Sequence, residues 1–334
     1  MPNGKNYLTM LMAEEEGYSI GLPDGVFFLE EGNDALQLGE KLCERVSKKG
    51  YRRVFPPLFE FYDTYAKGGS VDISRRSFAF KDKDGSLLAL RYDMTAPIAR
   101  MVAQRYEEKD LPLHLYYYGD VFREQPFHQG KPRQIRQLGI EIVGGDPLDT
   151  NAEMVSLLRE LMPLLDKEYR LVIGDIRLYK ACIENLDLSD VQREAIHRCF
   201  HLKDQPSLVS ILQGVAGEEK QKQKLLGLMD LVFPWENLSE KQKLLADFGR
   251  EGEMVYGDLV SLTKTLSSLE KGKVLLDFGM VKDLGYYSSL VVEAYSVKSG
   301  YAICHGGRYD GLYRAFGKNF SAVGFALDLS YTFR

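Results

Sequence analysis

The stretch from Tyr116 to Gly145, YYYGDVFREQPFHQGKPRQIRQLGIEIVGG, has the pattern of two strands joined by a loop. Before the loop, alternate positions share one strand face, namely Leu115, Tyr117, Gly119, Val121 and Arg123. After the loop, an apolar face and a polar face alternate: Leu138, Ile140 and Ile142 against Gln137, Gly139 and Glu141. Two polar groups flanking a glycine suit a sheet face that holds a small polar ligand, since the glycine gives room. The alternative is a hairpin with a solvated polar face.

The segments around this hairpin extend the prediction. The loop at residues 124–133 contains charged residues, two prolines and a glycine, so we expect it to arch over the polar face. The segment RYDMTAPIAR (91–100) predicts a helix that begins at Ala96, with Asp93 or Thr95 as its cap and Pro97 in its first turn. A purely structural cap is the commoner reason for such residues.

The composition is that of a water-soluble globular protein, with 334 residues, 45% of them hydrophobic and 27% charged. The net charge of −5 argues against a nucleic-acid partner. The sequence has no secretion signal and no apolar run of membrane-spanning length, so we expect no membrane contact and a cytoplasmic location. The cysteines lack CxxC spacing, so we expect reduced thiols, no metal site and no cofactor.

Residues 176–270 differ from the rest of the chain. They are rich in Lys, Gln, Glu and Leu, have an almost wholly helical pattern, and contain 12 basic and 15 acidic residues. We therefore expect a core made of residues 1–175 and 271–334, with a helical insertion domain at 176–270. Its acidic balance does not suit RNA binding, so we interpret it as a protein-contact or packing module.

Several motifs share one resemblance. FREQP…GKPRQIRQLGIE (122–141) resembles the second signature motif of class II aminoacyl-tRNA synthetases, in the histidyl branch. GYRRVFPPLFE (50–60) with the helix before it resembles the first motif, which builds a dimer interface in that family; an ordinary helix–strand unit is the alternative. KDLGYY (282–287) and HGGRYDGL (305–312) resemble histidyl-specific elements, and SAVGFALDLS (321–330) resembles the start of the third motif. The match covers roughly residues 20–330.

The resemblance implies an α+β fold with a mainly antiparallel class II synthetase-like sheet, flanked by helices and carrying a helical insertion. It also implies a histidine-binding site, made of Asp93, Thr95, Arg123, Gln137, Glu141, Lys282, Tyr286 and Tyr287. Asp93 and Gln137 suit the ammonium and carboxylate ends of histidine, and Glu141 with a tyrosine suits the imidazole. A carboxylate facing an imidazole favours its protonated form. The two tyrosines could instead be interfacial residues of a tyrosine-rich chain.

The departures from the family pattern concern the nucleotide. The third motif, of the VGFALGLER type, ends in an arginine that grips ATP phosphates, whereas the final two positions here are Ser330 and Tyr331. Lys282 replaces a histidyl-specific arginine, and the adenine-contacting glutamate of FRxE falls on Gln125. The sequence also stops at Arg334, where the family's enzymes continue into an anticodon-binding domain.

A chain that keeps the amino-acid half of the site and lacks the ATP half is expected to sense histidine. This combination resembles regulatory subunits of short-form ATP phosphoribosyltransferase, the first enzyme of histidine biosynthesis. That resemblance implies a non-catalytic chain, without catalytic residues, that forms a homodimer and a hetero-octamer with the catalytic subunit and mediates feedback inhibition by bound histidine. The alternatives are a truncated histidyl-tRNA synthetase-like enzyme that activates histidine with ATP, and a scaffold with a vestigial pocket.

Overall fold

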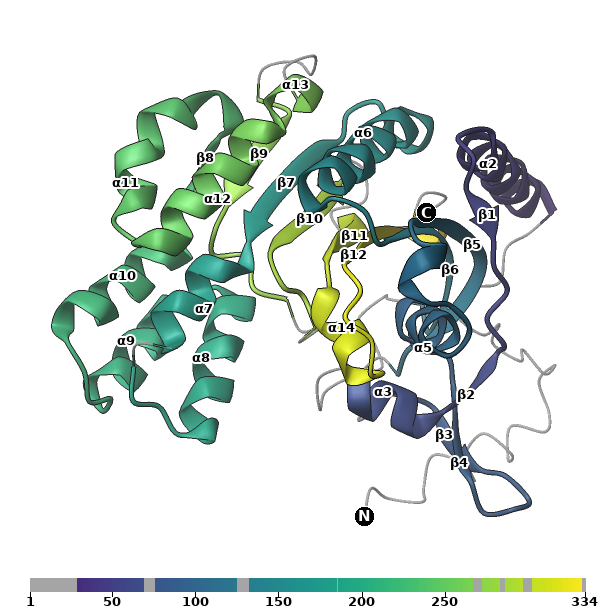
Figure 1. Cartoon of the computed structure of the whole chain (residues 1–334), viewed down its shortest axis with the longest axis horizontal. Coiled ribbons are helices and arrows are strands. Elements are labelled where there is room, and N and C mark those ends of the chain that lie inside the picture. Colours follow the sequence, from purple (N-terminus) through teal and green to yellow (C-terminus); the bar gives the residue numbers. More distant parts are fainter. Residues whose placement is uncertain are drawn as a thin grey trace, which may run out of the picture.

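The computed structural model describes residues 29–68, 76–124, 132–184, 186–266, 272–282, 286–296 and 302–331, with the backbone alone for 29–33, 68 and 331. Within these residues a nine-stranded sheet runs in the order β1-β5-β6-β12-β11-β10-β7-β9-β8 (Figure 1). The strands are β1 Arg52–Arg53, β5 Leu113–Phe122, β6 Gln134–Val143, β7 Arg170–Asp175, β8 Val232–Pro234, β9 Val274–Asp277, β10 Leu290–Tyr295, β11 Ala302–Arg308 and β12 Ala322–Asp328. The pairs β1–β5 and β7–β9 are parallel and the others antiparallel, so the sheet is mixed although mainly antiparallel, as expected.

The predicted hairpin forms the β5–β6 pair. Tyr117 lies opposite Gly139, and Gly119 lies opposite Gln137, so both predicted strand faces are confirmed. The apolar face of β6 is fully buried, and helices α2 (Leu29–Lys48) and α6 (Pro147–Leu165) pack on this part of the sheet (Figure 1). Residues 125–131 of the predicted arch lie outside the described residues.

The sequence before Gly50 predicts a helix that is capped near Asn33 or Asp34 and buries Leu36, Leu38, Leu42 and Val46. The structure has this helix as α2, but it begins earlier, at Leu29. Leu42 and Val46 are fully buried, as the helical period requires. Leu36, expected to point inward, is 52% exposed, because it lies near the start of the helix, before the turns that reach the core. The buried face of the helix therefore begins about one turn later than the periodic pattern of leucines predicts.

A second, three-stranded sheet follows α2 and β1. Its order is β2-β4-β3, with β2 Phe59–Phe61, β3 Ala79–Lys81 and β4 Leu87–Leu90. From Phe78 to Arg91 the sequence alternates on both sides of a turn at Asp82–Gly85, which predicts a hairpin, and β3 and β4 form it. Helices α3 (Tyr62–Gly68), α5 (Thr95–Arg105) and α14 (Asp310–Ala315) pack against one another beside it. Residues 108–110 form a short 3₁₀ turn, η1 (Glu108–Asp110).

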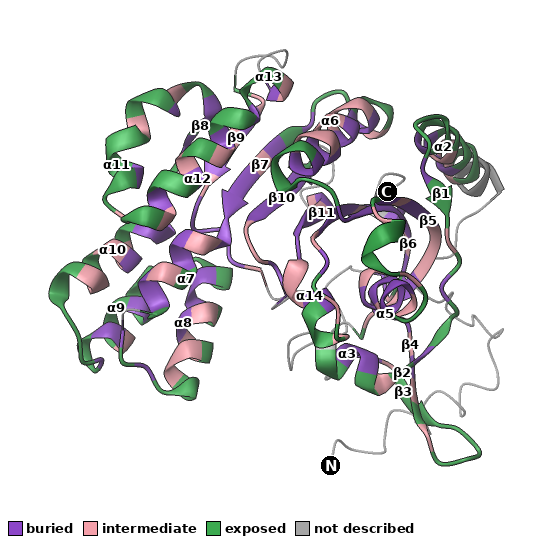
Figure 2. Ribbon diagram, viewed as in Figure 1, coloured by how far each residue is buried: buried purple, intermediate pink, exposed green. Residues whose placement is uncertain are grey.

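The stretch 176–270 is mainly helical, as expected, and its exposed surfaces lie on the left of Figure 2. Its helices are α7 Ile176–Glu184, α8 Asp190–Leu202, α9 Gln205–Gln213, α10 Glu219–Met229, η2 Trp235–Asn237, η3 Ser239–Lys241, α11 Gln242–Ala246, α12 Arg250–Ser261 and α13 Thr263–Leu266. Strand β8 interrupts them and pairs with β9, because Phe233 beside Leu276 completes the sheet edge. The division of the chain at 176 and 270 into core and insertion stays a prediction. No helix in the described part of the chain is long and apolar enough to cross a bilayer.

Candidate functional site

The site is built around Glu141, whose strand β6 lies near the middle of the sheet. Its Oε1 atom accepts a hydrogen bond from Thr95 Oγ1 at 2.8 Å, and its Oε2 atom accepts one from the hydroxyl of Tyr309. Thr95 begins α5, and Tyr309 follows β11, so segments far apart in sequence meet at one carboxyl group. Glu141 is 2% exposed.

Burial governs the protonation of this carboxyl group. Loss of water raises the pKa of Glu141 to about 8, and the nearby Asp93 adds to the rise, while the two hydrogen bonds oppose it. A group with such a pKa exchanges its proton near neutral pH. It can therefore share one proton with a basic nitrogen of a bound molecule.

Asp93 binds the first turn of helix α5 through one carboxylate oxygen and leaves the other oxygen unpaired among the described residues. Its Oδ1 atom accepts a hydrogen bond from the backbone N–H of Ala96 at 2.9 Å, as a capping carboxylate does, although the helix begins at Thr95 and its N-cap position is Met94. Its Oδ2 atom is buried without a hydrogen-bond partner among the described residues. Burial raises the pKa of Asp93, while the Ala96 N–H and the positive charge of Arg123 lower it. An unpaired buried carboxylate oxygen is costly, so this atom is a candidate acceptor for a ligand ammonium group.

Arg123, Gln137 and Asp328 lie at the other end of the site. Gln137 lies directly opposite Asp328 in the β6–β12 pair, and its Nε2 donates to Asp328 Oδ1 at 2.6 Å. The Nε of Arg123 donates to the carbonyl of Tyr92 at 3.2 Å. Burial by itself would lower the pKa of Arg123, but the charges of Asp328 and other acidic neighbours, Asp93 among them, raise it. The guanidinium therefore lies in the field of two carboxylates.

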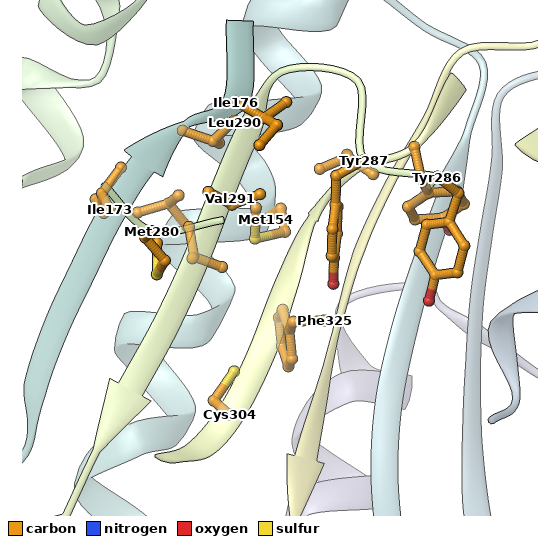
Figure 3. Packing of buried hydrophobic residues seen from close by; sticks show 14 of the residues in the cluster. Met154, Ile173, Ile176, Met280, Tyr286, Tyr287, Leu290, Val291, Cys304 and Phe325 are labelled. Carbon is orange, nitrogen blue, oxygen red and sulfur yellow. The ribbon is translucent and has the colours of Figure 1, made fainter. Parts of the chain in front are cut away.

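Tyrosines line the site. Tyr286 and Tyr287 lie side by side with their hydroxyl ends pointing the same way (Figure 3), and their ring centroids are 5.2 Å apart. Tyr286 also meets the ring of Tyr309 edge to face at 5.9 Å. Burial raises the pKa of both predicted tyrosines, with charges at Asp93 and Glu141 contributing. Both therefore remain neutral hydroxyl donors at physiological pH.

Among the described residues, Lys282 forms no hydrogen bond or ion pair with the other seven predicted residues. Its Nζ pairs with Glu293 on β10, a strand three places from β6 in the sheet. Glu293 Oε1 also lies 2.8 Å from His305 Nδ1, and its Oε2 accepts from the hydroxyl of Tyr295 at 2.6 Å. Residues 283–285 of the KDLGYY segment lie outside the described residues. A role for Lys282 in binding histidine stays a prediction.

Glycines give this sheet face its space, although not in the way the sequence predicts. A Cβ atom at Gly139 would overlap the hydroxyl of Tyr117, so a phenol fills the room expected for a ligand. A Cβ atom at Gly324 would overlap both the Oε2 of Glu141 and the backbone carbonyl of Ile140. Gly324 thus allows the Glu141 side chain to lie flat on the neighbouring strand.

Replacing Gly324 by alanine is expected to destabilise the chain by about 3 kcal/mol, because the carbonyl of Ile140 cannot move without shifting its strand. Urea unfolding measures the change. The matched control is Gly257→Ala in α12, where a Cβ would meet nothing within 4 Å and helix propensity improves by about 1 kcal/mol. Equal stability of the two variants would contradict the packing described here.

The sequence did not assign roles to Tyr309 and Asp328. Tyr309 belongs to the HGGRYDGL element, which resembles a histidyl-specific motif, and this membership could have indicated a place in the site. Asp328 stands where the VGFALGLER pattern has a glycine, and that departure was the signal for a new side chain on the sheet face. Both residues reach the site through long-range strand pairing.

The assembled site has three carboxyl groups, on Asp93, Glu141 and Asp328, and one guanidinium group, on Arg123. Such a balance suits a small ligand with positively charged nitrogen groups. Among the described residues, no group of three or more His, Cys, Asp or Glu is placed to hold a metal ion.

Comparison with known proteins gives the family. Residues 29–331 match a family model described as histidyl-tRNA synthetase. The chain is 32% identical over 317 residues to the ATP phosphoribosyltransferase regulatory subunit of Thermoanaerobacter pseudethanolicus, which covers 93% of this chain and 81% of the relative. The chain belongs to the histidyl-tRNA synthetase family. Within it, the chain is a member of the synthetase-like group named as ATP phosphoribosyltransferase regulatory subunits.

Two further proteins are similar to this chain. Histidine–tRNA ligase of Methanocaldococcus jannaschii is 30% identical over 301 residues, covering 90% of this chain and 71% of the ligase. A crystal structure of an ATP phosphoribosyltransferase regulatory subunit/histidyl-tRNA synthetase from Bacillus halodurans superposes with a TM-score of 0.81 at 24% identity, covering 95% of this chain and 83% of that chain. This likeness confirms the expected synthetase-like fold.

Proposed function

We propose that this chain is the non-catalytic regulatory subunit of an ATP phosphoribosyltransferase, and that it binds histidine to mediate feedback inhibition of the first step of histidine biosynthesis. The observation that carries the proposal is the buried cluster of three carboxyl groups around one arginine. The names of the family members support the regulatory role.

Each group of histidine has a complementary partner in the cluster. The unpaired Oδ2 of Asp93 accepts from the ammonium group. Glu141 exchanges a proton near neutral pH, as an imidazole does, so the pair shares one proton in the complex. Gln137 and Arg123 supply donors for the carboxylate. Tyr286 and Tyr287 close the site with aromatic surface and hydroxyl groups.

Regulation requires that histidine bind the less active state of the assembly more tightly. A difference of roughly 1–3 kcal/mol between the two states is typical of such coupling. Histidine bound between α5, β6 and the segment at Tyr286 would link parts of the chain that meet only in the folded state. This linkage gives histidine a means to favour one arrangement of the subunits.

The proposed partners are the catalytic subunit, in a cytoplasmic hetero-octamer, and a second copy of this chain. Exposed apolar residues after β1 support self-association, since Phe55, Leu58 and Phe59 in this short segment are 71%, 49% and 54% exposed. Contiguous exposed apolar surface marks protein contacts. This surface adjoins the helix and strand that the family uses as its first motif.

The deciding experiment is co-expression with the short phosphoribosyltransferase chain of the same organism. The expected result is a complex larger than either chain alone, with activity that depends on this subunit and falls when histidine is added. Calorimetry on the complex is expected to show saturable histidine binding. Absence of binding, or an activity indifferent to histidine, would overturn the proposal.

An enzyme that activates histidine is the second candidate, favoured by the likeness to a histidine–tRNA ligase. The end of β12 argues against it. Ser330 is buried, and its Oγ accepts from the backbone N–H of Arg136 at 2.8 Å, so this position links two segments of the fold. Histidine-dependent exchange of pyrophosphate into ATP would favour the enzyme.

A further inference from the structure

Asp328 occupies the end of the proposed site where the carboxylate of an amino acid would lie. It is 2% exposed and is the last residue of β12. Its Oδ1 accepts from Gln137 Nε2 at 2.6 Å, so one donor of that amide is already engaged. The register of β6 and β12 places the Gln137 and Asp328 side chains opposite each other, so the sheet itself fixes this pair.

Asp328 also acts on the positive charge of the site. Among the carboxylates, Asp328 raises the pKa of the Arg123 guanidinium most, and Asp93 follows. The Nε of Arg123 donates to the Tyr92 carbonyl, and its Cζ lies 5.1 Å from the centroid of the Tyr92 ring. A cation flanked by two carboxylates attracts a further anion much less than an unpaired cation does. The unpaired buried oxygen of Asp93 further favours a ligand that carries positive charge.

We infer that Asp328 sets the charge selectivity of this site, admitting a free amino acid and excluding ligands that carry a phosphate in place of its carboxylate. The inference rests on the proposed function and names the residue that decides which ligands the site accepts. A carboxylate brings one negative charge to Gln137 and Arg123, and a phosphate ester brings nearly two. At a separation of about 6 Å and an effective dielectric constant of about 20, the negative charge of Asp328 weakens binding about 100-fold for each negative charge on the ligand.

The test uses three probes that share the imidazole and ammonium groups, namely histidinol, histidine and histidinol phosphate. Their dissociation constants are measured by calorimetry or by competition with histidine. The wild-type chain is expected to bind histidinol phosphate far more weakly than histidinol. In Asp328→Asn, the ratio of these two constants is expected to fall at least tenfold. The ratio cancels a general weakening of the site.

The matched control is Asp120→Asn. Asp120 lies on β5, next to the strand of Gln137, and pairs with Arg136 on the opposite side of the sheet from Glu141. The control is expected to leave the ratio unchanged. If Asp328→Asn does not fold, as judged by its thermal midpoint, Asp328→Ser keeps an oxygen acceptor for Gln137 and serves instead.

An unchanged ratio in the Asp328 variants, with histidine still bound by the wild type, overturns this inference and leaves the proposed function intact. An equal fall in Asp120→Asn also overturns it, because the effect would then be one of overall charge. A wild-type complex that binds none of the three probes overturns the proposed function itself, and the inference with it.

Discussion

Replacing Glu141 by glutamine is expected to weaken histidine binding at least ~100-fold, while making the unliganded chain more stable at pH 8. Glutamine has the shape of the protonated acid but supplies no charge to an imidazolium group. Truncating one partner of a buried charged pair typically costs roughly 2–5 kcal/mol of binding free energy. Calorimetry at pH 7 measures the loss.

The stability effect has the opposite sign because of the raised pKa. Burial, with Asp93, raises the pKa of Glu141 to about 8, against about 4.3 in an unfolded chain. Between these values the folded state holds a proton that the unfolded state has released, so the free energy of unfolding falls as pH rises. Glutamine removes this loss, so at pH 8 the variant is expected to be more stable by roughly 3–5 kcal/mol. At pH 5 the difference is expected to shrink to about 1 kcal/mol.

Glu141→Ala in the co-expressed complex separates a sensor from a scaffold. A sensor loses its inhibition by histidine, whereas a scaffold with a vestigial pocket keeps it. Above pH 8 the wild-type site must take up a proton from solvent to bind an imidazolium, so its affinity should decline there. Tight histidine binding by Glu141→Gln would show that the ligand lies elsewhere.

Glu293→Gln, on the same face of the sheet as Glu141, is expected to destabilise the chain by about 3 kcal/mol at pH 7. Burial by itself would raise the pKa of Glu293, but the hydrogen bond and charge of His305, and those of Lys282, outweigh it and lower the pKa to about 2. Its carboxylate therefore contributes stability that is complete above about pH 4.3 and disappears as pH falls towards 2. Glutamine cannot supply that charge.

Urea unfolding of Glu141→Gln and Glu293→Gln, side by side at pH 5 and pH 8, checks both stability predictions. The two variants serve as controls for each other, since both lose one carboxylate from a buried position on the same sheet. A stability change of the same sign in both at pH 8 would show that the charges around these glutamates are not those described here.

The sequence predicted the local features well, because each depends on residues close together in the chain. The alternation from Leu115 to Arg123 predicts the face of β5 whose Tyr117 and Gly119 lie opposite Gly139 and Gln137, and the Asp93 carboxylate binds the first turn of α5. Strand β8 was missed, because three residues between helices have no periodic signal and become a strand only by pairing with β9.

The site itself was predicted in part. Asp93, Thr95 and Glu141 are coupled as a group, as the resemblance implied. The pairing of Gln137 with Asp328, and the filling of the space at Gly139 by Tyr117, depend on which strands are neighbours, and no local pattern contains that information. Lys282 was placed by its motif alone, and its actual partner Glu293 belongs to the following strand.

The parallel pairing of β7 with β9 has a consequence for folding kinetics. Leu171 lies opposite Val274, so this junction cannot form until the whole intervening segment has been synthesised and has brought its two ends together. The helices between β7 and β9 form contacts between residues that are close in sequence, so they can fold early. The last strands of the sheet pair only later. Because Tyr309 and Asp328 arrive with those strands, the residues of the candidate site can come together only after β12 has been synthesised.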